Sequence, residues 1–186
     1  MKTNRKAKHQ RQSLQIIAGT YRHRKIHFIE ADGLRPTSCR VRETLFNWLQ
    51  TDIYGKTCLD LFAGSGALGF EALSRGAKHV TFVEKNRQVA KQLQENIQQL
   101  NIDNATVMNR SFEQALSGQY DVIFLDPPYT LRLLPSLLEQ IKTLSPKLIF
   151  IEDNQRVDEW ITDTDSYKIL KSKKAGSIYY GLLSPN

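Results

Sequence analysis

Residues 60–69 carry the sequence Asp-Leu-Phe-Ala-Gly-Ser-Gly-Ala-Leu-Gly. They continue an apolar run that begins at Cys58, and they lead into a helical pattern from Ala67 to Ser74. Two glycines so close together let the backbone turn sharply and approach a ligand closely. A glycine-rich turn between a buried strand and a helix is typical of α/β folds that bind nucleotides. The segment therefore predicts an α/β protein with a nucleoside-like ligand at this turn.

Strands and helices alternate along the rest of the chain. The strands are expected at 58–63, 79–84, 106–109, 120–125 and 148–152, followed by an antiparallel pair at 167–171 and 177–183. Helices are expected at 67–74, 87–100, 112–116, 131–143 and 157–161. Because the central strands are continuous apolar runs, we expect a parallel arrangement covered on both faces. The pattern predicts a Rossmann-like, seven-stranded mixed sheet with helices on both faces.

The N-terminal region has a different pattern. Residues 14–18 and 25–29 predict a small β-hairpin, and Thr37 or Ser38 can cap a helix that runs to about Gln50. We therefore expect a basic N-terminal arm and hairpin over residues 1–36 and a larger domain over residues 37–186.

Positive charge is concentrated in the same region. The chain has 186 residues and a formal net charge of +7. Residues 1–42 contain eleven Lys or Arg and two acidic residues, a balance of +9, so the remaining residues carry −2. A nearly neutral body with a basic front end indicates a polyanionic partner, and we favour nucleic acid over a solubilising tail.

Several classes of protein and site are not expected. Cys39 and Cys58 lie in unrelated contexts, so we predict no disulfide framework and a reducing, cytoplasmic location. No stretch approaches the roughly 20 apolar residues of a membrane span. The four histidines show no ligand spacing, so no metal site is assigned. A monomer without a membrane partner is expected.

The glycine turn matches the pattern GxGxxG from Gly64 to Gly69, so a nicotinamide dehydrogenase has to be weighed. Asp60 argues against it, because a carboxylate there would repel a pyrophosphate but suit the ammonium group of a methionine moiety. Glu84 ends the next strand, 20 residues after Gly64, where a carboxylate can bind ribose hydroxyls. These features fit S-adenosylmethionine, bound in the crevice at the carboxyl ends of the strands.

A second motif, Asp126-Pro127-Pro128-Tyr129, follows the buried run 122–125. The prolines remove two backbone donors and favour extended geometry in the residues before them. Their carbonyl groups thus point outward as acceptors, beside a carboxylate and a flat ring. This set suits a planar substrate with an amino group, such as a nucleobase. Asp126 and the Pro127 carbonyl would accept the amine hydrogens, and Tyr129 would stack on the base.

The two motifs together resemble class I S-adenosylmethionine-dependent methyltransferases that act on amino groups. The blocks 33–37, 40–49, 59–69 and 71–77 resemble the bacterial RsmD family of small-subunit ribosomal RNA guanine-N2 methyltransferases, and the resemblance covers about residues 14–183. It implies that residues 37–186 form a class I methyltransferase domain. It also implies that the substrate is guanine 966 of 16S ribosomal RNA, methylated at N2. We expect to find this RNA within an assembling small ribosomal subunit, and free RNA stays open as the alternative.

The resemblance implies roles for individual residues. The catalytic residues would be Asp126, Pro127, Pro128 and Tyr129. The cofactor would be bound by Asp60, Phe62, Ala63, Gly64, Ser65, Gly66, Glu84, Ser111, Phe112 and Asp126. Related enzymes often carry Asp or Asn after the third strand to read the adenine amine. Here Ser111 would bond the adenine and Phe112 would cover its face, with helix core as the alternative for Phe112.

Five basic residues are assigned to RNA. Those on the hairpin are Arg22, Arg24 and Lys25, and the others are Arg35 and Arg132. Arg132 lies three residues after Tyr129, so it either binds a phosphate next to the target base or is a solvated helix residue. The family comparison places Arg35, Arg40 and Arg42 nearer the cofactor, where they would order the pocket instead.

Two other functions stay open. An adenine-N6 or other exocyclic-amine methyltransferase acting on DNA or another RNA shares the tetrapeptide, and only the N-terminal blocks separate it. The other is a non-catalytic module that binds nucleic acid on the same fold. The intact set of ligand-binding residues argues against this module: Asp60, Gly64, Gly66, Glu84 and Asp126.

Overall fold

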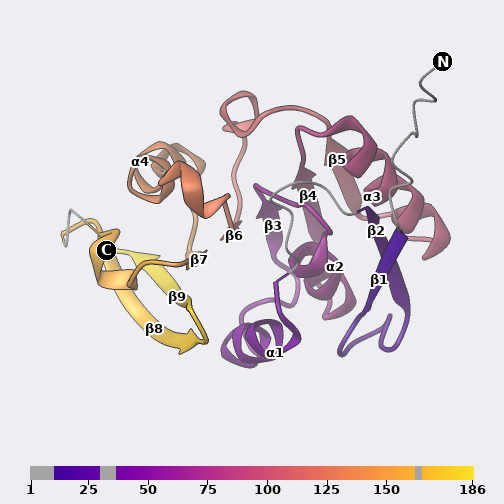
Figure 1. The fold of residues 1–186 in the computed structure, drawn as a ribbon, viewed down its shortest axis with the longest axis horizontal. Coiled ribbons are helices and arrows are strands. Elements are labelled where there is room, and N and C mark those ends of the chain that lie inside the picture. The colour runs from indigo at the N-terminus through magenta and orange to yellow at the C-terminus, as the bar shows by residue number, and fades with distance from the viewer. Residues whose placement is uncertain (1–10, 30–36, 162–164) are drawn as a thin grey trace, which may run out of the picture.

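The computed structural model describes residues 11–29, 37–161 and 165–186 (Figure 1). Its centre is a seven-stranded mixed sheet with the order β5-β4-β3-β6-β7-β9-β8. The parallel strands are β3 (Thr57–Asp60), β4 (His79–Val83), β5 (Ala105–Met108), β6 (Val122–Leu125) and β7 (Leu148–Asp153). The antiparallel strands are β8 (Tyr167–Ala175) and β9 (Ile178–Pro185). A separate hairpin consists of β1 (Arg11–Gln15) and β2 (Lys25–Ile29). The predicted Rossmann-like fold with its small N-terminal hairpin is confirmed.

Helices cover both faces of the sheet, and each face has its own hydrophobic core. One face carries α1 (Cys39–Trp48), α2 (Ala67–Ser74) and α3 (Arg87–Gln99), and its core includes Phe70, Phe82 and Phe124. The opposite face carries α4 (Leu134–Gln140) and short 3-10 helices at 112–115, 129–131, 141–144 and 157–159. None of the helices in the described part of the chain is long and apolar enough to span a membrane.

The hairpin is fastened to α2 and α3 by buried polar side chains. The carboxylate of Glu71, on α2, accepts hydrogen bonds from the backbone N–H groups of Ile17 (2.8 Å) and Ala18 (3.1 Å). Asn96, on α3, accepts the N–H of His27 at 3.0 Å and donates to its carbonyl at 2.7 Å. The hairpin also contributes two side chains to the core of this face, Ile16 and Ile26. Figure 1 shows it beside α3, at the edge of the molecule.

Two predicted strands end three residues earlier than expected, one because a carboxylate takes its N–H groups and the other because glycines turn the backbone. The strand expected at 14–18 lies at Arg11–Gln15, since Glu71 takes the N–H groups that a partner strand would otherwise bind. The strand expected to reach Ala63 ends at Asp60. Beyond it the chain turns at Gly64 and Gly66, whose φ angles are +49° and +76°.

The helix expected over 131–143 is interrupted. A 3-10 turn covers Tyr129–Leu131, α4 covers Leu134–Gln140, and a second 3-10 turn covers Ile141–Leu144. Arg132 adopts a left-handed conformation with φ of 47° between the first two segments. The chain thus changes direction directly after the tetrapeptide, which is why a regular helix cannot start there.

Candidate active site

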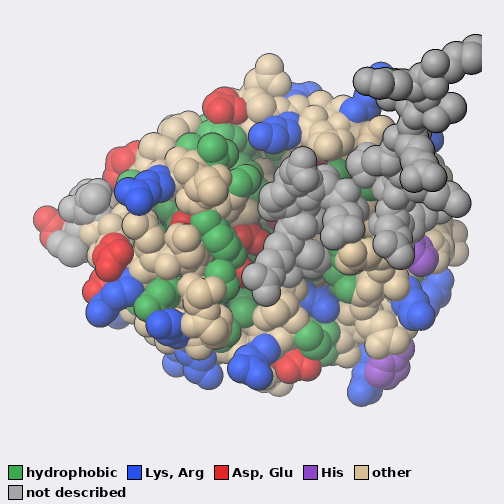
Figure 2. Space-filling model, in the orientation of Figure 1, with side chains coloured by type: hydrophobic (Ala, Val, Ile, Leu, Met, Phe, Trp, Pro, Cys, Tyr) green, Lys and Arg blue, Asp and Glu red, His purple; other side chains and the backbone are tan. Residues whose placement is uncertain are grey.

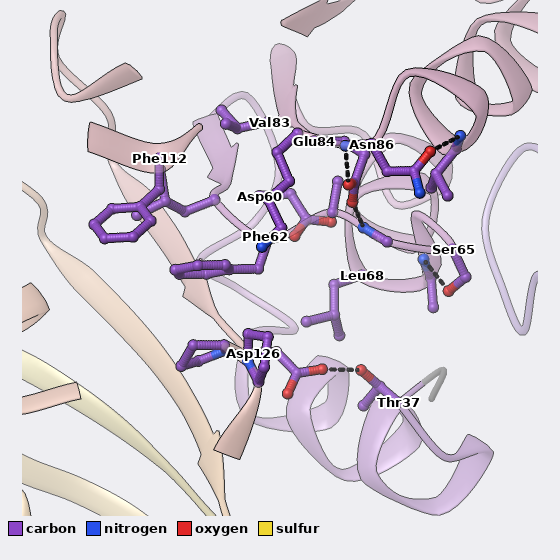
Figure 3. Close-up of a pocket in the computed structure, with 18 of the residues that line it drawn as sticks. Thr37, Asp60, Phe62, Ser65, Leu68, Val83, Glu84, Asn86, Phe112 and Asp126 are labelled. Atoms are coloured by element: carbon purple, nitrogen blue, oxygen red, sulfur yellow. Dashed lines mark hydrogen bonds between the residues drawn. The ribbon is translucent and has the colours of Figure 1, made fainter. Parts of the chain in front are cut away.

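A cavity of about 250 Å³ lies at the carboxyl ends of β3, β4 and β6 (Figure 3). Three segments contribute most of its lining: the glycine turn after β3, residues 83–86 at the end of β4, and the tetrapeptide after β6. Carboxyl ends of parallel strands where the strand order reverses are the usual ligand site of an open α/β sheet. The two motifs that the sequence singled out therefore face one cavity.

The side chain of Asp60 fixes the start of α2, next to the glycine turn. Gly66 precedes α2 and has no side chain to cap it, and Asp60 Oδ2 accepts the N–H of Gly69 in the first turn at 3.1 Å. A Cβ at Gly66 would lie only 2.6 Å from the ring of Phe70, so this position requires glycine. Burial raises the pKa of Asp60 to about 7, and Glu84 acts in the same direction while the Gly69 N–H opposes both. A cation beside Asp60 would therefore stabilise its ionised form.

Glu84 is held above the same turn by two backbone donors. Its Oε2 accepts the N–H of Gly64 at 3.0 Å and its Oε1 accepts the N–H of Asn86 at 2.7 Å, as Figure 3 shows. Asn109 donates to the carbonyl of Glu84 at 2.8 Å and so fixes the end of β4. A carboxylate oxygen can accept a further hydrogen bond. Glu84 is therefore oriented to receive hydroxyl donors from a ligand in the cavity.

Asp126 enters the cavity from the end of β6. The hydroxyl of Thr37 donates to Asp126 Oδ2 at 3.3 Å (Figure 3). Burial raises the pKa of Asp126 well above its usual value, Glu152 and Asp60 add to the rise, and the Thr37 hydrogen bond opposes it. The position of Asp126 among other carboxylates makes it a stronger proton acceptor than a solvated aspartate.

The remaining tetrapeptide residues have distinct environments. The hydroxyl of Tyr129 donates to Glu152 Oε1 at 2.9 Å, which fixes the ring toward β7. Burial raises the pKa of Tyr129, and the charges of Asp126 and Glu152 reinforce the rise. The Pro128 carbonyl accepts the N–H of Leu131 at 3.0 Å. The hydrogen bonds within the described residues do not use the Pro127 carbonyl, which is the one expected to bind the substrate amine.

The two residues expected at the adenine lie differently. Phe112 lines the cavity, with its ring centroid 5.3 Å from that of Phe62, and it also packs against the core under α4. Both interpretations of Phe112 thus fit its position. Ser111 is not among the lining residues, and its hydrogen bond with Glu113 lowers the pKa of Glu113. The other residues assigned to the cofactor all line the cavity except Gly66, which shapes the turn: Asp60, Phe62, Ala63, Gly64, Ser65, Glu84 and Asp126.

The four described basic residues among those assigned to RNA lie outside the cavity. Those on the hairpin, Arg22, Arg24 and Lys25, are exposed, and Arg24 reaches the carbonyl of Gln99 at 3.5 Å. Arg132 is exposed beside Asp153, whose pKa it lowers against the larger effect of burial. Arg35 is outside the described residues.

The position of Arg42 differs from the one that the family resemblance implied. It is buried, donates to the carbonyl of Gln15 at 3.1 Å and lies 3.7 Å from Glu71. Arg42 therefore orders the hairpin and not the pocket. Arg40 is exposed on α1 and does not line the cavity.

Sequence reasoning missed two residues of the site. The local pattern indicates Thr37 only as a helix cap, but Ser38 fills that role by accepting the N–H of Val41 at 3.3 Å. Glu152 is indicated only as the end of a strand, although an acidic residue after a buried apolar run is a signal that could have identified it. In the described part of the chain, no three His, Cys, Asp or Glu side chains group where they could hold a metal ion.

Residues 14–184 match the model of a protein family described as conserved hypothetical protein 95. The chain belongs to this family. Its relatives include ribosomal RNA small subunit methyltransferase D of Haemophilus influenzae, which is 44% identical over 180 residues that cover 91% of this chain and 92% of that protein. The Escherichia coli protein of the same name is 39% identical over 175 residues, covering 91% and 88%. The predicted membership of the RsmD family is confirmed.

A solved structure supports the same assignment. The Escherichia coli protein yhhF, described as a putative methyltransferase, has 36% sequence identity and a TM-score of 0.84, and the match covers 94% of this chain and 99% of that chain. The likeness therefore extends over the hairpin, the sheet and the cavity, because almost the whole chain is superposed.

Proposed function

We propose that this protein transfers a methyl group from S-adenosylmethionine to the exocyclic N2 of a guanine in 16S ribosomal RNA, which the family resemblance identifies as guanine 966. The observation that carries the proposal is the acceptor pair at the end of β6. Asp126 is oriented by Thr37, and the Pro127 carbonyl adjoins it, in the same cavity as Asp60 and Glu84. The names of the curated relatives support ribosomal RNA of the small subunit as the substrate class.

The cavity fits a cationic cofactor. Three carboxylates, Asp60, Glu84 and Asp126, line it in a protein whose net charge is +7. Burial raises the pKa of Asp60 and of Asp126, and neighbouring carboxylates add to the rise, so a ligand with positive charge would favour the ionised forms. S-adenosylmethionine carries an ammonium group and a sulfonium group, and when bound it supplies an electrophilic methyl group. Asp60 would bind the ammonium, Glu84 the ribose hydroxyls, and Phe62 with Phe112 the adenine.

The chain's own groups would make the guanine amine reactive. The lone pair of N2 is delocalised into the ring, which makes it a poor nucleophile. Asp126 and the Pro127 carbonyl would accept its two hydrogens, favour a pyramidal nitrogen and return electron density to the lone pair. Orientation of this kind contributes up to roughly 7–11 kcal/mol in favourable cases. Asp126, with its raised pKa, or water would then accept the proton that leaves N2.

The pKa of Asp60 makes cofactor affinity depend on pH. Below about pH 7 Asp60 holds a proton, and binding of an ammonium group requires its release. We therefore expect affinity for S-adenosylmethionine to fall by up to about tenfold per pH unit below 7 and to level off above it, until the ammonium group itself begins to lose its proton near pH 8. Calorimetric titrations between pH 5.5 and 8.5 would measure this change. An Asp60→Asn variant should bind more weakly and lose the dependence, and an unchanged pH profile would exclude Asp60 as the ammonium ligand.

Tritium transfer from labelled S-adenosylmethionine tests the function itself. The labelled cofactor is incubated with protein-free 16S RNA, 30S particles and DNA, and the products are digested to nucleosides. We expect label in N2-methylguanosine from RNA or particles. Label in N6-methyladenosine would support the alternative amino-methyltransferase, and absence of transfer and of cofactor binding would support a non-catalytic module. The same assay compares free RNA with the assembling subunit as substrate.

We also propose that the arm and hairpin, residues 1–36, hold the RNA, and that the enzyme works in the cytoplasm as a monomer. Deleting the whole region would remove buried Ile16 and Ile26 and damage the core. Substituting the exposed basic side chains is the cleaner test: Arg22, Arg24 and Lys25.

A further inference from the structure

The last two strands also carry positive charge, although residues 43–186 are close to neutral as a whole. Residues 167–186 contain four lysines and no Asp or Glu. All four are on β8, and all are exposed: Lys168, Lys171, Lys173 and Lys174. The strand lies at the edge of the sheet, paired only with β9 among the described strands.

The strand register places two of these lysines at the edge of the sheet that holds the cavity. Glu152 of β7 pairs with Tyr180 of β9, which pairs with Lys173 of β8. The next row joins Asp153, Tyr179 and Lys174. Neighbouring strands are about 4.8 Å apart, so the backbone of Lys173 lies about 10 Å from that of Glu152. Glu152 accepts a hydrogen bond from Tyr129 of the tetrapeptide. In the strand order, β7 and β9 separate these lysines from β6, which ends just before Asp126.

Other positive charge lies near Lys174. The ammonium group of Lys174 lies 4.7 Å from the ring centroid of Tyr179. Tyr179 pairs with Asp153 in the sheet. The charge of Arg132 lowers the pKa of Asp153 against the larger effect of burial. Figure 2 shows Lys and Arg side chains over the β8–β9 hairpin, at the lower left of the view, with acidic side chains beside them at the left and in the hollow near the centre. The basic groups thus flank the cavity on the side of β7, while the N-terminal hairpin lies beyond α3 on the other side.

We propose that Lys173 and Lys174, together with Arg132, form a second RNA-binding surface that contacts phosphates next to the target nucleotide. The inference rests on the proposed function, and it extends RNA binding to a part of the chain for which the N-terminal charge bias predicted no role. An acidic cavity suits a cationic cofactor and a neutral base, but it repels a phosphate backbone. Basic groups are therefore needed at the rim of the cavity, where the RNA strand enters and leaves. With positive charge on both sides, RNA would span the mouth of the cavity.

A different explanation of the lysines predicts another pattern. Lysines on an edge strand also prevent pairing with other chains. That role applies to Lys168 as much as to Lys173, since both are exposed on the same strand. Lys168 pairs with Ser184, next to the row of Ile149, and so lies at the opposite end of the sheet from the cavity. Lys168 is therefore a control on the same strand.

The experiment compares Lys173→Gln/Lys174→Gln with Lys168→Gln/Lys78→Gln, in which Lys78 precedes β4 at the end of the sheet away from the cavity. Binding of 16S RNA is measured at several salt concentrations for both variants and the unmodified protein. We expect the first variant to bind several-fold more weakly near 0.1 M salt. Its slope of log affinity against log salt should fall by roughly 0.7–0.9 for each phosphate that the variant no longer binds. The control variant should keep the slope, and both should keep the affinity for S-adenosylmethionine.

Each other result would overturn the inference. Unchanged RNA affinity and slope in the first variant, with increased aggregation by light scattering, would assign the lysines to edge protection. Equal losses in both variants would assign them to diffuse charge. The proposed function is tested separately by tritium transfer with the unmodified protein. If that protein methylates RNA while the first variant binds as tightly, only the second surface is excluded.

Discussion

Replacing Asp126 with alanine is expected to lower the rate of methyl transfer by about 10²–10⁴-fold, the range typical of a positioned acid–base group. The variant loses the carboxylate that accepts an amine hydrogen and then the proton. Cofactor affinity should stay near that of the unmodified protein, because Asp60 and Glu84 would make the contacts to the methionine and ribose groups. Single-turnover rates with saturating RNA, measured beside calorimetric cofactor titrations, separate the two effects.

Two further variants make the test of Asp126 specific. Asp126→Asn keeps an acceptor oxygen but cannot take a proton, so it should retain more activity than alanine. Thr37→Val removes only the hydrogen bond to Asp126, seen at 3.3 Å, and should cause a smaller loss. Because Asp126 is buried and neighbouring carboxylates repel it, its removal should leave the melting temperature unchanged or higher. A fully active alanine variant would rule out the acceptor role.

The parts of the site that could be predicted depend on local sequence. A buried strand followed by closely spaced glycines specifies the turn after β3, and a strand followed by two prolines specifies the acceptors after β6. Both strands run in the same direction in a doubly wound sheet, so their carboxyl ends had to meet at one edge. That is why Asp60, Glu84 and Asp126 could be assigned to a single ligand site from the local patterns alone.

The parts that could not be predicted depend on contacts between distant segments. Thr37 and Asp126 are 89 residues apart, and nothing in the local pattern around Thr37 indicates a partner other than a helix terminus. The lysines of β8 are visible in the sequence, but their distance from the cavity follows from the order β6-β7-β9-β8. The sequence pattern of an antiparallel pair does not predict which edge of a parallel sheet the pair joins. The proximity of these lysines to the tetrapeptide was therefore not expected.

Glu71→Ala is expected to have the largest effect on stability. Glu71 is fully buried in α2, where the helical pattern alone gives no hint of its role. Besides the two hairpin N–H groups, it accepts a hydrogen bond from Arg75 at 2.8 Å and lies 3.7 Å from Arg42. Removing one partner of a buried charge network typically costs about 3–5 kcal/mol, because the other charges remain buried without compensation. Urea unfolding should show a loss of this size.

The hairpin should loosen before the sheet does. Its N–H groups at Ile17 and Ala18 have no partner strand, since Glu71, 54 and 53 residues away, holds them instead. Hydrogen exchange at these two amides should therefore accelerate in Glu71→Ala far more than at amides of β3 or β6. Glu71→Gln retains an acceptor oxygen without the charge. Its exchange rates at these amides should lie between those of the unmodified protein and those of Glu71→Ala. Unchanged protection of Ile17 and Ala18 in the alanine variant would mean that apolar packing of Ile16 and Ile26, and not the buried carboxylate, fastens the hairpin to α2.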